Sequence, residues 1–250
     1  MIFTIAAREL RMAFLSPIAW VLIGVLQIVL GFMTGFNFEN FISFVQPQQH
    51  LIKQHLGVTD FVIIPQYGIL AITMVFTIPI ITMRVFSDER RNQTLALLFS
   101  APISMTEIVV GKYLGLLFTL FIMLLIISIM PICVLFFGSI DFGLFFSSII
   151  GTFLLMSSCA AIGLYISSLT TNPIISALLT FFALLMLWAL SIATGDSPDK
   201  FSLADLSMFH HLQPFQRGLF SSHDFIYFIL FITVFLVLAV RRLDRDRLQG

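Results

Sequence analysis

Hydrophobic residues run along the chain in long uninterrupted stretches, and charged residues gather in the short segments between them. A membrane-spanning helix needs about 20 mostly apolar residues, because each adds about 1.5 Å across a hydrocarbon core of about 30 Å. The longest uncharged stretch, between Asp141 and Asp196, is divided near Asn172 and Pro173, which favour a turn. The pattern predicts six spans, at about 17–36, 62–83, 113–136, 143–168, 173–194 and 225–240.

Residues 1–16 show a helical periodicity instead of a continuous apolar run. At about 100° per residue, one side carries Phe3, Ala7, Leu10 and Phe14, and the other carries Thr4, Arg8 and Arg11. This pattern is typical of an interfacial helix that lies in the membrane surface with its basic face toward the headgroups. A cleaved signal peptide is the competing interpretation, and the absence of an A-x-A-like site after the apolar run disfavours it.

The expected fold class is therefore an all-α polytopic membrane protein, with an N-terminal amphipathic surface helix and six transmembrane helices in one membrane domain over 1–250. Composition agrees, since 59% of residues are hydrophobic and 10% are charged, against about 25% charged in soluble domains. A soluble domain, a disordered chain and a secreted disulfide scaffold are excluded. The 13 basic and 13 acidic residues balance, so nothing indicates nucleic-acid binding.

The basic residues predict the orientation, because cytoplasmic loops carry an excess of Lys and Arg. With the N-terminus inside, three basic residues lie in the outer segments 37–61 and 195–224, namely Lys53, Lys200 and Arg217. The inner segments hold the others: Arg8, Arg11, Arg84, Arg90, Arg91, Lys112, Arg241, Arg242, Arg245 and Arg247. We therefore expect both termini in the cytoplasm.

Signatures of chemistry are missing from the sequence. No Asp, Glu, Lys, Arg or His lies inside the expected spans, which argues against proton- or sodium-coupled transport. Enzyme motifs and a P-loop are absent, so we expect no catalytic site, no cofactor and an energy source in a partner. His210, His211 and His223 are the nearest approach to a metal site, and we interpret them as ordinary residues of an outer loop. Cys133 and Cys159 lie in apolar runs and are expected to pack, not to bind metal.

Small residues indicate where helices approach each other closely. Gly24, Gly31 and Gly35 share one side of the first span, and the last two have small-xxx-small spacing. We expect them to form a helix-packing face. The fourth span has a similar run, consisting of Ser157, Ser158, Ala160, Ala161 and Gly163.

The charged inner loop 84–112 carries the strongest local signals. Ser87 is placed to cap a helix whose first turn holds Asp88 and Glu89, where acidic residues favour the helix dipole. Leu95, Leu98 and Phe99 extend it as an apolar stripe, so we expect a short amphipathic helix over about 88–100 that ends before Pro102. Ser104 and Glu107 form a capping box for the next helix. From these residues alone, the helix either faces the membrane or docks a cytosolic partner.

This loop resembles the coupling segment of ABC type-2 permeases, the membrane subunits of ATP-driven transporters. The residues that carry the resemblance, and that it implies couple the subunit to its ATPase, are Asp88, Glu89, Arg90, Arg91, Thr94, Leu95, Leu98, Ser100, Pro102, Glu107 and Lys112. The segment 209–218, together with Asp224 to Tyr227, is similar to the gliding-motility-associated and copper-processing branches. The chain departs from the family pattern at Gln93, commonly Gly, and at Ala96, often acidic.

The resemblance implies a permease subunit in the bacterial cytoplasmic membrane, acting in export or in mechanical coupling to an extracytoplasmic partner. Implied partners are two copies of a cytosolic P-loop ATPase, a second membrane half that is this chain or a similar permease, membrane lipid, and in the gliding-associated branch a membrane-anchored protein with a periplasmic domain. The alternative is an ATP-independent carrier or a structural scaffold, which predicts no nucleotide-binding partner and no effect of changes at 88–100.

Overall fold

The computed structural model describes residues 1–45, 59–94, 104–133, 141–194 and 207–249. Helices account for nearly all of these residues, and no strand occurs among them. Six helices are long and apolar enough to cross a membrane, as the hydrophobic pattern predicts. They are α2 (Pro17–Asn40), α3 (Ile64–Thr82), α6 (Met105–Cys133), α7 (Phe142–Leu169), α8 (Pro173–Thr194) and α10 (Ser222–Gln249).

Shorter elements connect these six helices. They are α1 (Ile2–Leu15), α4 (Ser87–Arg91), α9 (Met208–Gln216) and the π-helical turns η1 (Phe41–Val45) and η3 (Thr59–Ile63). Local sequence sets several helix starts. Ser16 caps α2 through the Ile18 N–H at 3.4 Å, and Asp141 caps α7 through the Gly143 N–H at 2.9 Å.

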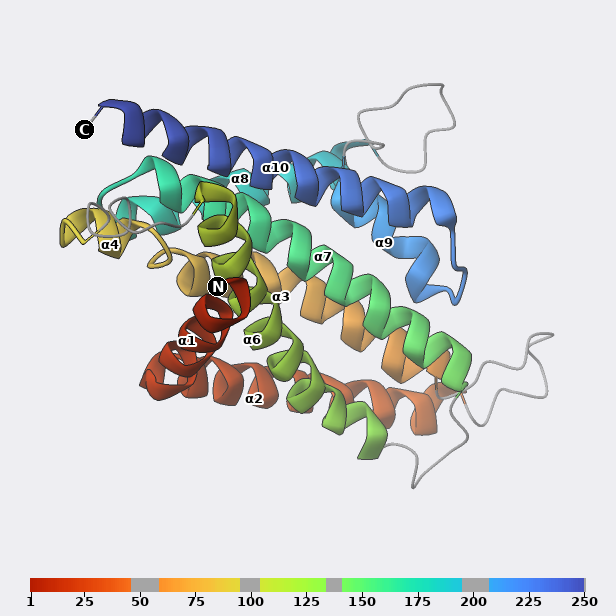
Figure 1. Cartoon of the computed structure of the whole chain (residues 1–250). Coiled ribbons are helices and arrows are strands. Elements are labelled where there is room, and N and C mark those ends of the chain that lie inside the picture. Colours follow the sequence, from red (N-terminus) through yellow and green to blue (C-terminus); the bar gives the residue numbers. More distant parts are fainter. Residues whose placement is uncertain (46–58, 95–103, 134–140, 195–206, 250) are drawn as a thin grey trace.

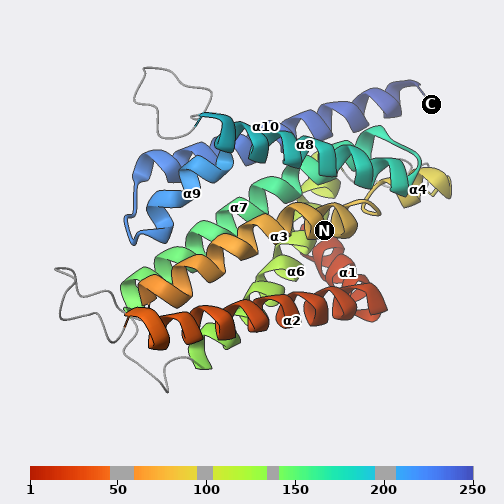
Figure 2. The ribbon, with the colours of Figure 1, turned by 180° about the vertical axis from the view of Figure 1, so that it is seen from behind.

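Helix α7 forms the centre of the bundle, where it contacts α3, α6, α8, α9 and α10 (Figure 1). Its run of small residues is buried, and a Cβ at Gly163 would collide with Thr82 of α3. From behind, α3 runs alongside α7 over most of its length (Figure 2). The small side chains therefore allow the close helix approach that the sequence indicates for this span.

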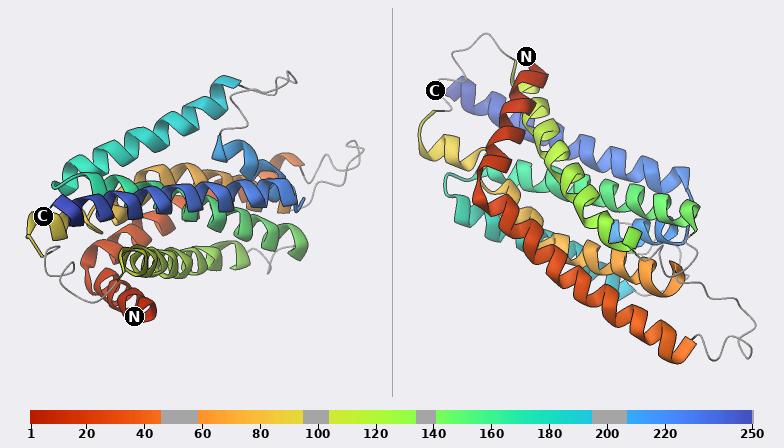
Figure 3. Two further views of the ribbon diagram at one scale, coloured as in Figure 1. Left: turned by 45° about the horizontal axis from the view of Figure 1, so that its top comes forward. Right: turned by 90° about the horizontal axis from the view of Figure 1, so that it is seen from below.

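Outer helices leave much of their surface uncovered. Large apolar side chains are exposed along α2, α8 and α10, among them Phe32, Phe182 and Leu230. Helix α8 diverges from the rest of the bundle along its length (Figure 3). Such faces suit lipid or another membrane helix, because neither exposes them to water.

Both chain ends lie at one end of the bundle, together with α4 and the start of α6 (Figures 1 and 3). Arg8, Arg84, Arg90, Lys112 and Arg242 belong to this end, and we call it the basic end. Helix α1 turns sharply away from α2 at Ser16 and packs across α6 (Figure 3).

Helices α6 and α10 extend furthest past the expected spans. Helix α6 starts at Met105 instead of residue 113, so Lys112 lies two turns inside it, and α10 continues to Gln249 instead of ending at 240. The second outer segment, expected to be a loop, contains α9. The extensions contain charged residues, because ion pairs compensate Lys112 in α6, and the exposed Arg241 and Arg245 in α10 remain solvated.

Candidate functional site

The N-terminus of helix α4 is capped by a side chain of another helix. Ser167 of α7 accepts hydrogen bonds from the backbone N–H groups of Phe86 and Ser87, at 3.1 and 3.2 Å. The Ser87 hydroxyl donates to the Met83 carbonyl instead of capping α4. The expectation that Ser87 is the cap is therefore wrong, because a neighbouring helix supplies the acceptor that its own side chain would have provided.

The helix is shorter than the sequence predicts. It ends at Arg91, and Gln93 adopts a left-handed backbone with φ of 56°. A non-glycine residue with positive φ cannot continue a right-handed helix, so a single helix over 88–100 is wrong. Thr94 closes the turn, since its N–H donates to the Glu89 carbonyl at 3.0 Å. The remaining expected coupling residues Leu95, Leu98, Ser100 and Pro102 lie outside the described residues.

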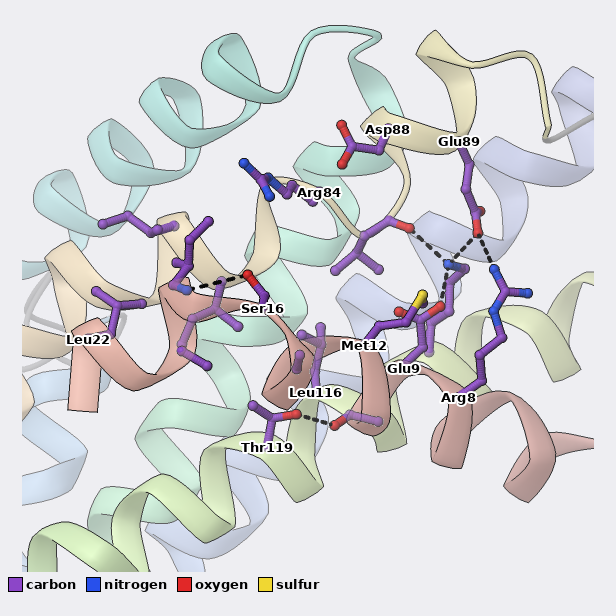
Figure 4. Close-up of a pocket in the computed structure, with 18 of the residues that line it drawn as sticks. Arg8, Glu9, Met12, Ser16, Leu22, Arg84, Asp88, Glu89, Leu116 and Thr119 are labelled. Atoms are coloured by element: carbon purple, nitrogen blue, oxygen red, sulfur yellow. Dashed lines mark hydrogen bonds and ion pairs between the residues drawn. The ribbon is translucent and has the colours of Figure 1, made fainter. Parts of the chain in front are cut away.

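Lys112 is the centre of a buried ionic cluster at the basic end. Only 2% of the residue is exposed, and its ammonium donates to Glu9 at 2.8 Å, to Glu89 at 2.7 Å and to the Val85 carbonyl at 2.9 Å (Figure 4). An ammonium group has three donors, and all three are used. The cluster joins α1, α4 and α6, because each contributes one of the three charged side chains.

Two glycines of α6 allow Glu9 to reach this cluster. A Cβ at Gly115 would lie 2.6 Å from the Glu9 Cβ, and one at Gly111 would lie 2.9 Å from the Ile5 Cβ. Helix α1 therefore rests on bare backbone of α6, in the close approach typical of small-xxx-small spacing.

The glycines singled out in α2 lie differently. Gly31 approaches the Met130 side chain, with a built Cβ 3.0 Å from its Cε, whereas a Cβ at Gly24 or Gly35 would meet nothing within 4 Å. Among the described residues, these two glycines thus leave an open face on α2.

A second ion pair fastens α4 to the last helix. Arg90 pairs with Asp246 of α10, and Arg242 approaches the same carboxylate group at 3.5 Å. Glu89 and Arg90, both expected to dock an ATPase, are thus engaged inside the chain. Asp88 is half-buried and Arg91 is exposed, and neither forms an ion pair within the part of the chain that the structure describes.

The start of α6 follows the expected capping box. The Ser104 N–H donates to the Glu107 carboxylate at 3.1 Å, and the Glu107 N–H donates to the Ser104 hydroxyl at 3.2 Å. Glu107 therefore orders the beginning of the helix that carries Lys112.

Histidines at the opposite end of the bundle are not all ordinary loop residues. His211 is 3% exposed, lies 2.6 Å from the Asp224 carboxylate through Nδ1, and stacks on Tyr227 with ring centroids 3.9 Å apart. The interpretation as a solvated loop residue is wrong for His211, because α9 packs it against α10. Ligand atoms of His211, His223 and Asp224 lie within 4.8 Å of one another, and the His211–Asp224 hydrogen bond accounts for this geometry.

Sequence reasoning missed Glu9, Asp246 and Ser167. A signal was available for Glu9, since Gly111 and Gly115 show the same small-xxx-small spacing that was noted in the first span. No local pattern indicates Asp246 or Ser167, because both meet α4 across a large sequence separation.

Comparison with known proteins gives a family match that spans the helices described above. A family model described as "ABC-2 family transporter protein" matches residues 3–248. A search of curated proteins gives no match. The matched range includes all but the first residue of α1 and the last residue of α10, and it contains both ion clusters at the basic end.

Proposed function

The chain belongs to the ABC-2 transporter family, and on that premise we propose that a cytosolic P-loop ATPase docks on α4 at the basic end. Membership makes the chain a permease component of an ABC transporter, a multi-pass membrane subunit of a kind that normally pairs with an ABC ATPase. Such subunits are generally non-catalytic.

The basic end faces the bacterial cytoplasm in this proposal, which places both termini inside. The distribution of Lys and Arg supports this orientation. Helix α1 lies in the inner membrane surface. Its Phe3 is 77% exposed, on the side of the helix away from α6, and an exposed aromatic residue at that position is suited to the headgroup boundary.

The proposal rests on the ion pairs that α4 forms with other helices of the chain. Glu89 binds Lys112 of α6 and Arg90 binds Asp246 of α10, while Asp88 and Arg91 make no such pairs in the described residues. The ATPase engages the outward charges, and the inward charges transmit its movement to α1, α6 and α10. An element held on one side by a buried pair and on the other by a partly buried pair moves with its neighbours, because breaking each pair would leave a charge uncompensated.

Two ATPase subunits serve two membrane halves, the second being another copy of this chain or a similar permease. Export is the expected direction. The resemblance of 209–218 to the gliding-associated and copper-processing branches supports a mechanical variant, in which α9 and the start of α10 contact an extracytoplasmic partner. A carrier or scaffold that works without ATP is the rival, and it requires no ATPase at α4.

Co-purification tests the docking proposal. The tagged chain is isolated from its native membranes in mild detergent, and its partners are identified by mass spectrometry. We expect a stoichiometric P-loop ATPase with the unmodified chain and its loss with Asp88→Lys/Arg91→Glu.

Glu39→Lys/Arg217→Glu is the matched control, because it also reverses one acid and one base, both exposed and outside the basic end. The control should retain the ATPase. Isolation of the intact chain without any ATPase, or full retention by the Asp88→Lys/Arg91→Glu variant, would contradict docking on α4.

A further inference from the structure

A cavity of about 450 Å³ opens at the basic end, beside the Lys112 cluster (Figure 4). It lies between α1, the first turns of α2, the end of α3, α4 and α6. Cavities of this size accommodate a small molecule or part of a lipid.

The deep part of the cavity is apolar. Leu22 of α2, Ile80 and Ile81 of α3, and Leu116 and Met123 of α6 form its walls. Along α6 it extends from Lys112 to Met123, and at 1.5 Å per residue this is about 16 Å. That depth equals roughly half of a hydrocarbon core of about 30 Å, which is the length of one leaflet.

The charged residues that line the cavity lie at its mouth. Lys112 is neutralised by Glu9 and Glu89, so it offers nothing further to a ligand. Arg8 is different, since its side chain is 61% exposed and only approaches the already engaged Glu89 at 4.0 Å.

Arg84 is the second cation at the mouth. It is exposed, and it has no carboxylate within ion-pair distance among the described residues. Its guanidinium and the Asp88 carboxylate lie on the side of the cavity formed by the end of α3 and α4 (Figure 4). Arg8 lies across the Lys112 cluster from Arg84 (Figure 4), so Arg84 is the cation beside the apolar channel, and this arrangement matches a phosphate attached to an acyl chain.

We propose that this cavity binds one phospholipid of the surrounding leaflet. Arg84 holds the phosphate, and one acyl chain lies along Leu22, Ile80 and Leu116. Asp88, beside Arg84, accepts from a headgroup amine, so the probe of choice is phosphatidylethanolamine. The proposal goes beyond docking of the ATPase and shares only Asp88 with it, and the variants that test lipid binding leave Asp88 unchanged.

Native mass spectrometry tests it on the purified chain, with any subunits that accompany it, after exposure to phosphatidylethanolamine in mixed micelles. We expect one lipid to remain bound per chain after the detergent is removed. Arg84→Gln should reduce the bound fraction about tenfold, because it removes a charge-assisted contact to phosphate. Arg11→Gln, one turn from Arg8 and outside the cavity lining, should bind as the unmodified chain does.

A second variant tests the apolar part independently. Ala19 lines the cavity, so Ala19→Phe should fill it and prevent binding while the thermal unfolding temperature is maintained. Equal retention of lipid by the unmodified chain and by Arg84→Gln would overturn the proposal. It would also be overturned if inorganic phosphate at millimolar concentration displaced the lipid, because the site would then recognise a free anion.

Discussion

Lys112 shows how the position of one charge decides its role. A lysine this deeply buried loses its hydration, and several kcal/mol of desolvation must be offset by its partners. Two carboxylates and the Val85 carbonyl supply that compensation. Lys112 is therefore a connector inside the chain, and it is not available to an ATPase as the sequence resemblance implied.

Replacement of Lys112 tests this role. Lys112→Met leaves Glu9 and Glu89 without their cation, and we expect a loss of about 3–5 kcal/mol in the free energy of unfolding. Thermal unfolding in detergent measures it. Arg91→Met removes an exposed charge from the same end and should change stability by less than about 0.5 kcal/mol. Equal stability of the two variants would show that the buried cluster contributes nothing.

Gln93 is the second residue whose role depends on its surroundings. Its positive φ is unfavourable for a residue with a Cβ, by about 1–2 kcal/mol, and glycine adopts it freely. Gln93→Gly should therefore stabilise the chain by up to about 1 kcal/mol, since the relief of strain exceeds the entropy lost by glycine.

Gln93→Ala is its control, because it shortens the side chain and keeps the strain. Comparison of thermal unfolding temperatures measures both variants. A lower unfolding temperature for Gln93→Gly than for Gln93→Ala would mean that the left-handed turn is not strained.

At the scale of elements, hydrophobic length predicts the six long helices and the capping box predicts the start of α6. Helix pairing could not be predicted in the same way. The same spacing occurs at Gly31 and Gly35 in α2 and at Gly111 and Gly115 in α6. Within the described residues, helix α1 packs directly on both glycines of α6, whereas a Cβ at Gly35 would meet nothing within 4 Å. The difference arises from α1, whose Ala6 carbonyl and Glu9 pack against Gly115. This packing depends on the tertiary structure, which glycine spacing alone does not indicate.

A larger residue at Gly115 should displace α1. In Gly115→Ala the new methyl would lie 2.6 Å from the Glu9 Cβ and 3.0 Å from the Ala6 carbonyl oxygen. Overpacking of this kind costs about 1–3 kcal/mol. Hydrogen exchange of the α1 amides, which should accelerate, measures the displacement.

Gly24→Ala is the matched change on α2, where a Cβ meets nothing within 4 Å. It should leave exchange in α1 unchanged. Similar exchange in the two variants would show that α1 does not depend on the α6 glycines.

The candidate site could be predicted only where its signals were local. Asp88 and Glu89 in the first turn of α4 follow from the preference of acidic residues for the positive end of the helix dipole. Their partners do not, because Arg90 meets Asp246 from the far end of the chain and Glu89 meets a lysine on another helix. The length of α4 also depends on one backbone angle at Gln93, for which residue type gives no indication.

At the scale of the molecule, α4 is bonded to both sides of the basic end. Glu89 connects it to α1 and α6 through Lys112, and Arg90 connects it to α10. Ser167 adds a link to the central helix α7. A force applied to the outward face of α4 thus reaches most of the bundle through hydrogen bonds and ion pairs, while the ATPase needs to contact only a short segment.

Transmission through Lys112 is the central claim, and one distance measurement tests it. Spin labels at exposed Thr4 in α1 and Asn172 before α8, in a Cys133→Ser background, report the separation of the two elements in the ATPase complex. We predict that a non-hydrolysable ATP analogue shifts this distance in the otherwise unmodified chain. The shift should disappear in Lys112→Met/Glu9→Gln/Glu89→Gln, which removes all three charges together and retains the ATPase on co-purification. An equal shift in that variant, or none in the unmodified chain, would contradict the account.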